Sequence, residues 1–312
     1  MIDFEAVGKT YGGHRVVDGI DFSVKRGAFC ALIGASGSGK STTLRMINRL
    51  VEPDQGRVLF DGQPVRNFAA EDLRRRMGYV IQSVGLFPHW TVARNIGAVP
   101  ALLGWDRRRI RDRVDELMAL LRLDPALAGK YPHALSGGQA QRVGVARALA
   151  ADPELLLMDE PFGALDPVTR AALQGELARI HRETGKTIVF VTHDMDEALQ
   201  LATQIVVLEQ GRILQDASPA TLLAHPATDG VREFVGRYDR GLKLLSLLPV
   251  TERMHHVDRE EGPPIEDGVD CRTALSRMVE LRCDRLSVIN AEGVSIGVVR
   301  LADLLGSGTA AE

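Results

Sequence analysis

The chain of 312 residues is 45% apolar and 25% charged, a composition typical of globular proteins and not of disordered ones. Its net charge of −3 gives no general case for nucleic-acid binding, and no run approaches the ~18 consecutive apolar residues of a transmembrane helix. Three widely spaced cysteines argue against a disulfide framework or a zinc site. The opening segment MIDFEAV lacks the apolar core of a signal peptide, so we expect a cytoplasmic chain.

Strands and helices are expected to alternate along the first part of the chain. Apolar runs predict strands at 3–7, 21–24, 29–33, 57–62, 78–82, 155–160 and 187–193. Helical spacing predicts helices at 40–50, within 91–123, at 136–152 and at 167–183. This alternation indicates an α/β fold built on a parallel sheet.

The later part of the chain is expected to form a second domain. The segment QIVVLEQGRILQDA predicts a hairpin that turns at Gln210 and Gly211, and a short helix is expected from Ser218. Acidic residues outnumber basic ones after Thr251, which supports a separate unit with its own surface. We place the boundary after residue 240, so that the predicted domains are 1–240 and 241–312.

The segment GASGSGKST lies between a predicted buried strand and a predicted helix. It fits the phosphate-loop pattern G-x-x-x-x-G-K-[ST], in which glycines let backbone N–H groups turn toward phosphate oxygens. The start of the helix adds free donors and partial positive charge. Lys40 is predicted to reach the β- and γ-phosphates and Ser41 to bind Mg²⁺. The candidate phosphate-binding residues are Gly34, Ala35, Ser36, Gly37, Ser38, Gly39, Lys40, Ser41 and Thr42.

Two further segments carry groups that suit nucleotide chemistry. LLLMDEP ends a predicted strand in Asp159, which can hold Mg²⁺, and Glu160, which can orient an attacking water. Taken alone, this acidic pair is equally compatible with a solvated turn. LSGGQ places a second anion site at the start of a helix, with a plain helix cap as the alternative. Its candidate residues are Ser136, Gly137, Gly138 and Gln139.

With these motifs in this order, the chain resembles the ATPase subunits of ABC transporters from Met1 to about Arg240. Gln82 follows the segment GYVI, as the family's Q-loop does, and Asp166 ends GALD at the D-loop position. His193 stands at the switch-histidine position, and Tyr11 stands where the family stacks an aromatic ring on adenine. Outside this context, both would be interpreted as structural or surface residues.

The resemblance implies a mechanism in which two subunits face each other head to tail. Each ATP would lie between the phosphate loop of one subunit and the LSGGQ of the other, with Ser136 and Gly138 acting in trans. Ser41, Gln82 and Asp159 would serve Mg²⁺. The catalytic residues would be Lys40, Glu160, which would polarise water, and His193, which would hold the γ-phosphate.

The resemblance also implies partners at the cytoplasmic face of the cell membrane. Integral-membrane permease subunits would bind the helical region that follows Gln82, where Phe87, Pro88 and Trp90 are candidate docking residues. Ordinary packing within a helical subdomain is the alternative for those three. A substrate-binding protein would act indirectly, and no nucleic-acid partner is expected. Ala140, which follows LSGGQ, departs from the glutamine that importers often carry there.

The residues around the motifs are similar to those in the ATPases of quaternary-amine or osmoprotectant importers, which transport glycine betaine, choline or carnitine. MINRLVEPDQG and LFPHWTVARNI are among the matching stretches. The segment 273–305 reads as helix, strand, strand, helix and looks like one CBS motif, where such ATPases often carry two. The predicted architecture is therefore a P-loop NTPase of the ABC type with a mixed sheet and a helical subdomain, plus a small α+β CBS-like domain.

Other classes of ATPase use similar motifs. A chromosome or repair ATPase would have long coiled coils between these motifs. The stretch from Lys40 to Ser136 is short and shows no heptad pattern. A translation-factor ATPase usually carries two cassettes in one chain. The main alternative is an ABC importer for another small solute, such as a metal ion or an amino acid, and an exporter subunit is a less favoured one.

Overall fold

The computed structural model describes residues 1–83, 85–163, 165–236, 239–256 and 262–305. The chain forms two compact units, Met1–Ser218 and Pro219–Glu312. None of the helices in the described ranges combines the length and the apolar character that crossing a bilayer requires.

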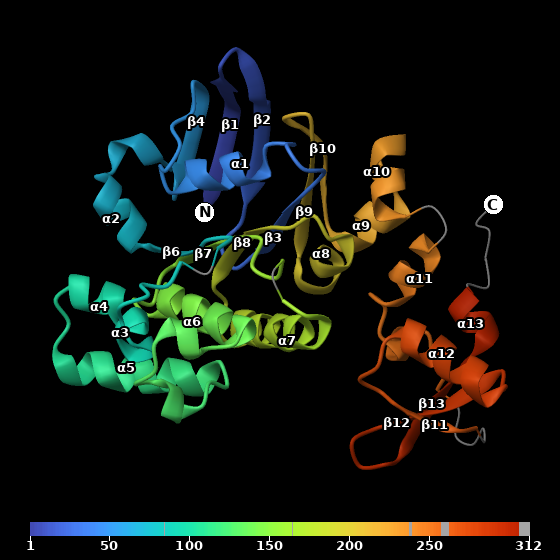
Figure 1. The fold of residues 1–312 in the computed structure, drawn as a ribbon. Coiled ribbons are helices and arrows are strands. Elements are labelled where there is room, and N and C mark those ends of the chain that lie inside the picture. The colour runs from blue at the N-terminus through green and yellow to red at the C-terminus, as the bar shows by residue number, and fades with distance from the viewer. Residues whose placement is uncertain (84, 164, 237–238, 257–261, 306–312) are drawn as a thin grey trace. The chain divides into compact units, whose positions relative to one another are not determined.

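A six-stranded sheet forms the centre of the first unit (Figure 1). Its order is β10-β9-β3-β8-β7-β6, and all pairings are parallel except that of β9 with β10. Strands β3, β7 and β8 are buried at every residue, as expected for strands covered on both faces. The bounds are β3 Phe29–Ile33, β6 Met77–Val80, β7 Leu155–Asp159, β8 Thr187–Val191, β9 Gln204–Glu209 and β10 Arg212–Ala217.

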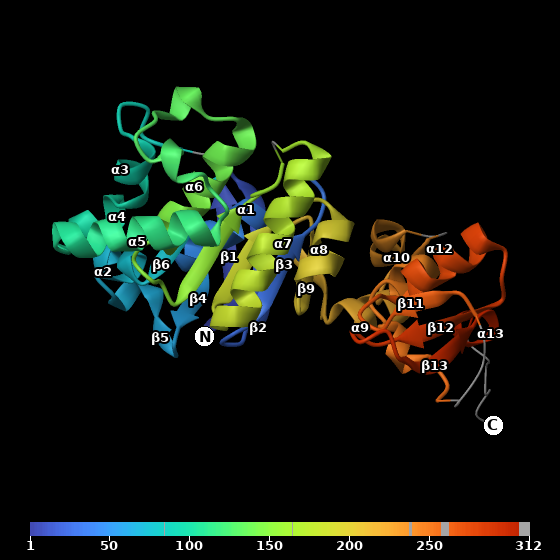
Figure 2. The same cartoon turned by 90° about the horizontal axis from the view of Figure 1, so that it is seen from below.

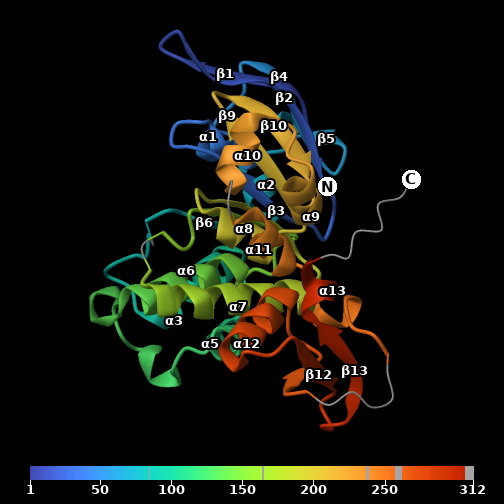
Figure 3. The same ribbon diagram turned by 90° about the vertical axis from the view of Figure 1, so that its right-hand side faces the viewer.

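A smaller antiparallel sheet packs over the first, with helix α1 (Lys40–Ile47) between the two (Figures 1 and 3). Its order is β2-β1-β4-β5. Phe4 of this sheet, Leu44 of α1 and Val189 of the central sheet belong to one apolar core. The bounds are β1 Ile2–Tyr11, β2 His14–Val24, β4 Gln55–Phe60 and β5 Gln63–Pro64.

The remaining helices of the first unit include the predicted helical subdomain. Helices α3, α4 and α5 cluster beside α6, and α7 runs alongside α6 (Figures 1 and 2). The bounds are α2 Ala70–Arg75, α3 Val92–Ile96, α4 Ala98–Leu102, α5 Arg107–Leu120, α6 Gly137–Leu149, α7 Pro167–Thr184 and α8 Met195–Leu201.

The second unit begins with three short helices and ends in a small α/β layer. Its sheet has the order β11-β12-β13, in which β11 and β12 are parallel and β12 and β13 antiparallel. Cys271, Met278, Val288 and Leu304 contribute to its apolar core. The bounds are α9 Pro219–Ala224, α10 Asp229–Val235, α11 Arg240–Leu245, β11 Pro264–Glu266, α12 Cys271–Leu281, β12 Arg285–Ile289, β13 Ser295–Arg300 and α13 Leu301–Leu305.

The predicted α/β fold, the helical subdomain and the hairpin at Gln210 and Gly211 are all present. The predicted mixed sheet is also present, since β10 is antiparallel in the central sheet, and the early strands form a second, antiparallel sheet that the alternation of strands and helices did not predict. The predicted boundary after residue 240 also differs from the observed division, which follows Ser218. Helix α9 packs against α11, so the segment from residue 219 to 240 joins the second unit.

Candidate functional site

The phosphate loop (Gly34–Thr42) connects buried β3 to α1, as predicted. Gly34 and Gly39 have φ angles of +149° and +100°, which side chains other than glycine rarely tolerate. A Cβ added at Gly34 would lie 2.0 Å from the Leu208 carbonyl oxygen, and one at Gly39 would lie 2.6 Å from that of Val16. The path of the loop therefore requires glycine at both positions.

The Lys40 side chain is buried and folds back over the loop. Its Nζ donates hydrogen bonds to the carbonyl oxygens of Gly34 and Ala35, both at 2.8 Å. Burial lowers the pKa of Lys40, and the nearby carboxylates of Glu160 and Asp159 act in the opposite direction. An anion in the loop would stabilise the charged ammonium, because it would offset this desolvation.

Asp159 ends β7 beside the start of α1. The Ser41 Oγ donates to its Oδ1 at 2.7 Å, and Arg45 Nη2 lies 3.1 Å from its Oδ2. The carboxylate is buried, and these two partners satisfy both of its oxygens. Ser41 and Asp159, which the sequence analysis assigns to Mg²⁺, therefore lie within hydrogen-bonding distance of each other, and Arg45 is a partner that the sequence analysis did not name.

Glu160 stands at the junction of three segments. Gln82 Nε2 donates to its Oε2 at 3.2 Å, and His193 Nδ1 lies 3.7 Å from the same oxygen. Its φ is +47°, a conformation that costs a residue other than glycine about 1–2 kcal/mol. The side chain remains one-quarter exposed, so a water molecule can reach it. The chain therefore holds a strained, accessible carboxylate between an amide and an imidazole.

The LSGGQ segment (Leu135–Gln139) starts α6 through a capping box. The Gln139 backbone N–H donates to the Ser136 Oγ at 3.3 Å, and the Ser136 N–H donates to the Gln139 Oε1 at 2.9 Å. A Cβ at Gly138 would lie 2.1 Å from Thr169 Cγ2, whereas one at Gly137 would meet nothing within 4 Å. The helix start is thus preformed, exposed at Ser136 and Gly137, and tight against α7 at Gly138.

Asp166 and Tyr11 lie at the edges of the site. Asp166 caps α7 by accepting from the N–H groups of Val168 and Thr169 at 3.2 and 3.1 Å. The Thr169 side chain and backbone bonds hold the pKa of Asp166 below its ordinary value. Tyr11 ends β1 with a half-exposed ring, and Lys9 Nζ lies 5.3 Å from the ring centroid. An exposed ring at this position is free to stack on a flat ligand.

Hydrogen bonds and ion pairs thus bring the predicted site residues together in two groups. Ser41 bonds to Asp159, and Gln82 and His193 contact Glu160. Within the described residues, no such bond joins Ser136, Asp166 or Tyr11 to those groups. One further link was missed: the buried Gln141 Nε2 donates to the Pro161 carbonyl at 2.8 Å, tying α6 to the turn after Glu160. Its only sequence signal was its place two residues after LSGGQ.

The residues present fit a nucleotide with a divalent cation. The Ser38 Oγ is buried within the loop and has no hydrogen-bond partner in the described structure, so it is a ready donor to a phosphate oxygen. Lys40 and the N-terminus of α1 supply positive charge at the same point. Ser41 and Asp159 present hydroxyl and carboxylate oxygens, the ligands that Mg²⁺ prefers.

Comparisons with known proteins agree with this site. The family model "ABC transporter" matches residues 17–163. The glycine betaine uptake system ATP-binding protein YehX of Escherichia coli (strain K12) is 54% identical over 305 residues, covering 98% of this chain and 99% of that protein. The chain belongs to the ATP-binding subunits of ABC transporters. The Bacillus subtilis (strain 168) protein OpuCA, a glycine betaine/carnitine/choline transport ATP-binding protein, is 45% identical over 96% of this chain and 78% of its own length.

Solved structures of ABC cassettes share the fold. The cassette MJ0796, in a dimeric post-hydrolysis state bound to ADP and Pi, matches with a TM-score of 0.64 and 32% identity over 70% of this chain and 99% of that one. The cassette cbiO1 from Clostridium perfringens gives a TM-score of 0.67 at 30% identity over 77% and 96%. This chain is accordingly an ABC-type ATPase subunit with a nucleotide-binding cassette.

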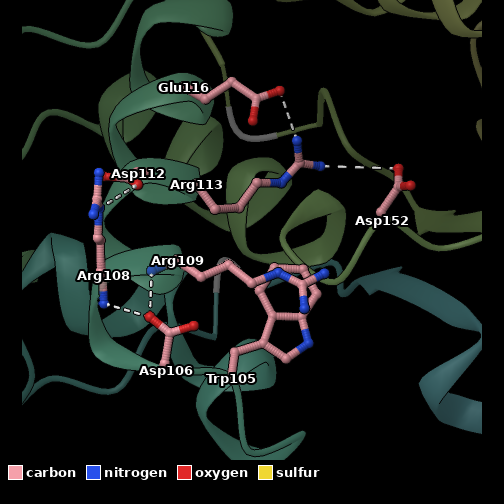
Figure 4. Close-up of a pocket in the computed structure, with 8 residues that line it drawn as sticks. All are labelled: Trp105, Asp106, Arg108, Arg109, Asp112, Arg113, Glu116 and Asp152. Atoms are coloured by element: carbon pink, nitrogen blue, oxygen red, sulfur yellow. Dashed lines mark hydrogen bonds and ion pairs between the residues drawn. The ribbon is translucent and has the colours of Figure 1, made fainter.

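Surface hollows of the cassette include one apart from the nucleotide motifs and one that borders Gln82. One of about 510 Å³ surrounds Trp105 on the helical subdomain (Figure 4). There Arg109 lies over the indole, 3.5 Å from its centroid, and Arg113 reaches both Glu116 and Asp152. Arg113 is thus paired with two acids, and the Arg109 guanidinium packs on the indole. The other, of about 630 Å³, is lined by Arg45, Leu50, Val51, Tyr79, Ile81, Gln82 and Ser83.

Proposed function

We propose that this chain hydrolyses ATP to drive the import of a quaternary-amine osmoprotectant, such as glycine betaine or choline, through a membrane permease. The observation that carries the cargo class is the extent of the similarity. Relatives named for betaine, choline or carnitine transport align over 300 residues or more. The Synechococcus elongatus sulfate/thiosulfate import protein CysA is also 45% identical, but over only 235 residues.

The catalytic roles follow from the geometry of this chain's residues. Lys40 and the loop amides would hold the phosphates, with Ser41, Asp159 and Gln82 available to Mg²⁺, which neutralises phosphate charge when bound. Glu160 would accept a hydrogen bond from the attacking water, because its carboxylate is accessible and its Oε2 already faces Gln82 and His193. His193, which is mostly exposed, would turn toward the γ-phosphate.

The assembly that fits these features is a head-to-tail homodimer. The LSGGQ segment caps its own helix and shares no hydrogen bond with the phosphate-loop group in the described residues, so its free N–H groups point to a ligand held elsewhere. A second copy of this chain would present its bound nucleotide to them. Asp166 would lie near the same contact.

The permease contact is proposed at the hollow beside Gln82 and at the segment that follows it. Phe87 is 42% exposed, its ring lies 4.4 Å from that of Trp90, and Pro88 between them is exposed. A groove with apolar walls next to an aromatic pair suits a short helix of a partner. Binding there would hold the chain at the cytoplasmic face of the membrane, with a substrate-binding protein acting on the permease from the other side.

The tail from 241 to 312 is proposed as a regulatory domain built on one CBS-like motif. Its described elements follow the order expected from the sequence, with α12, β12, β13 and α13, and β11 adds a parallel strand. A single motif would pair with its twin in the dimer. Cross-linking of the full chain within the tail tests this: efficient intersubunit cross-links are expected, and a dimer whose tails never cross-link would contradict it.

Uptake of labelled glycine betaine tests the function as a whole. Cells that lack this chain would be supplied with the wild type or with Glu160→Gln at low and high osmolarity. Rescue by the wild type alone is expected. If neither restores uptake while the purified wild type hydrolyses ATP, the cargo assignment is wrong, and an importer for another small solute becomes the account to test.

A further inference from the structure

An arginine outside the predicted motifs touches two segments of the site at once. Arg170 lies in the first turns of α7, and its Nη2 donates to the Leu165 carbonyl, next to Asp166, at 3.2 Å. On its other side, Arg170 Nη1 lies 3.8 Å from Asp194 Oδ2, and Nε lies 3.8 Å from Glu197 Oε1. One guanidinium therefore spans the loop that carries Asp166 and the start of α8.

Glu197 in turn fixes the histidine loop (Thr192–Asp194). The Thr192 Oγ1 donates to its Oε2 at 2.5 Å and accepts from the Asp194 N–H at 3.0 Å. These bonds fasten the residues on both sides of His193, while the His193 side chain stays exposed. Glu197 itself is buried. The position of His193 thus depends on a buried carboxylate whose facing cation is Arg170.

The contact between Arg170 and Glu197 is incomplete in this arrangement. At 3.8 Å it is an ion pair without a hydrogen bond, and the buried Nε of Arg170 has no hydrogen-bond partner in the described residues. A small shift of either loop would close it into a charge-assisted hydrogen bond, which is stronger and directional. A buried donor and a buried carboxylate held just beyond bonding distance leave room for this contact to shorten.

We propose that Arg170 and Glu197 are a positioning pair that couples the Asp166 loop to the histidine loop. The inference rests on the proposed head-to-tail dimer, in which Asp166 lies near the partner subunit. Engagement of the partner would shift the Leu165 carbonyl and Arg170, and through Glu197 and Thr192 would set His193 against the γ-phosphate. The pair would then affect the catalytic step and leave nucleotide affinity nearly unchanged.

Titration of Glu197 gives this pair a signature in the pH profile. Burial raises the pKa of Glu197 and Asp194 adds to the rise, while the Thr192 hydrogen bond, Arg170 and His193 oppose it. As the pH falls, Glu197 therefore takes up a proton sooner than an ordinary glutamate, and the neutral acid no longer attracts Arg170. Turnover of the wild type should therefore begin to fall at a higher pH than an ordinary glutamate would cause, and Glu197→Gln should remove this part of the fall.

The test compares Arg170→Met, Glu197→Gln, the double variant and the control Arg182→Met in the full chain. Arg182 is an exposed arginine of the same helix. We expect kcat for ATP to fall about tenfold in each single variant with KM little changed, and no further fall in the double variant, because the two residues act as one unit. Thr192→Ser should retain activity that Thr192→Val loses, and thermal unfolding checks that the variants fold.

If the losses of kcat in the two single variants multiply in the double variant, the residues act independently and the coupling is wrong. It is also wrong if the variants lose kcat/KM through a higher KM and keep their kcat. The coupling is likewise contradicted if Glu197→Gln leaves the fall of kcat at acidic pH unchanged. A folded wild type that hydrolyses no ATP would instead refute the proposed function, and the coupling would fall with it. Failure of the cargo assignment alone leaves this test intact.

Discussion

The two anion-binding segments of the cassette begin their helices in opposite ways. In the phosphate loop, Gly39 caps α1 without a side chain, Lys40 folds back onto carbonyls of the loop, and Ser41 bonds to Asp159 of β7. In LSGGQ, Ser136 and Gln139 satisfy each other's backbone, and within the described residues their side chains bond to no other segment. The phosphate loop is therefore bonded to other residues of its own chain, whereas LSGGQ is a complete helix start that is exposed at Ser136 and Gly137. In the proposed dimer, one chain would therefore supply two unlike halves of a shared site.

On the phosphate-loop side of the site, Glu160→Gln is expected to reduce ATP hydrolysis more than any other change. The amide keeps the size of the side chain but loses the negative charge that would polarise water, so ATP hydrolysis should fall about 10²–10⁴-fold while nucleotide binding persists. Phosphate release and binding of a fluorescent ATP analogue measure the two. Glu209→Gln, at an exposed strand end, is the control and should leave both unchanged. Hydrolysis near the wild-type rate would contradict the role of Glu160.

Gly137→Glu tests the LSGGQ side of the site. Its Cβ would meet nothing within 4 Å, and an acid in the first turn of a helix is favourable, so the chain should fold normally. The carboxylate would nevertheless repel a partner's bound nucleotide, and hydrolysis should fall by at least about tenfold. Gly137→Ala should lose far less. A normal rate in a folded Gly137→Glu would show that this helix start does not meet nucleotide.

Gly34→Ala addresses the folding requirement of the phosphate loop. The added Cβ would press on the Leu208 carbonyl in a conformation unsuited to alanine, so the free energy of unfolding should fall by about 2–3 kcal/mol. Urea unfolding monitored by circular dichroism measures it. The control Gly175→Ala, in the interior of α7 with open space around it, should raise stability by about 0.5–1 kcal/mol. Equal stabilities for both variants would contradict the geometry.

Tyr11→Ala should give the smallest loss. Removing a ring that would stack on adenine costs about 1 kcal/mol, which raises the KM for ATP roughly fivefold with kcat retained. Tyr11→Phe keeps the ring and should behave as the wild type. Steady-state kinetics over a range of ATP concentrations separate the two constants. A KM that Tyr11→Ala leaves unchanged would remove this residue from the site.

The sequence revealed what lies within short segments. The glycines, Lys40 and Ser41 lie in one short segment, so their arrangement around a phosphate could be predicted from a single loop between a strand and a helix. Arg45, Gln141 and Arg170 escaped notice, because Asp159, Pro161 and Glu197, which they contact, are distant in the chain and meet them only through the packing of the helices. The domain boundary differed for a related reason: the sequence does not reveal that α9 packs against α11, and this contact assigns the segment from residue 219 to the second unit.

Mixing two inactive variants tests the shared site most directly. Lys40→Ala disables the phosphate loop and leaves LSGGQ intact, and Gly137→Glu does the reverse. In a mixed head-to-tail dimer, one site would combine the intact loop of one chain with the intact LSGGQ of the other. Equal mixing should therefore restore about a quarter of the wild-type rate, since half of the dimers are mixed and each has one working site. A mixture no more active than its components would contradict the account.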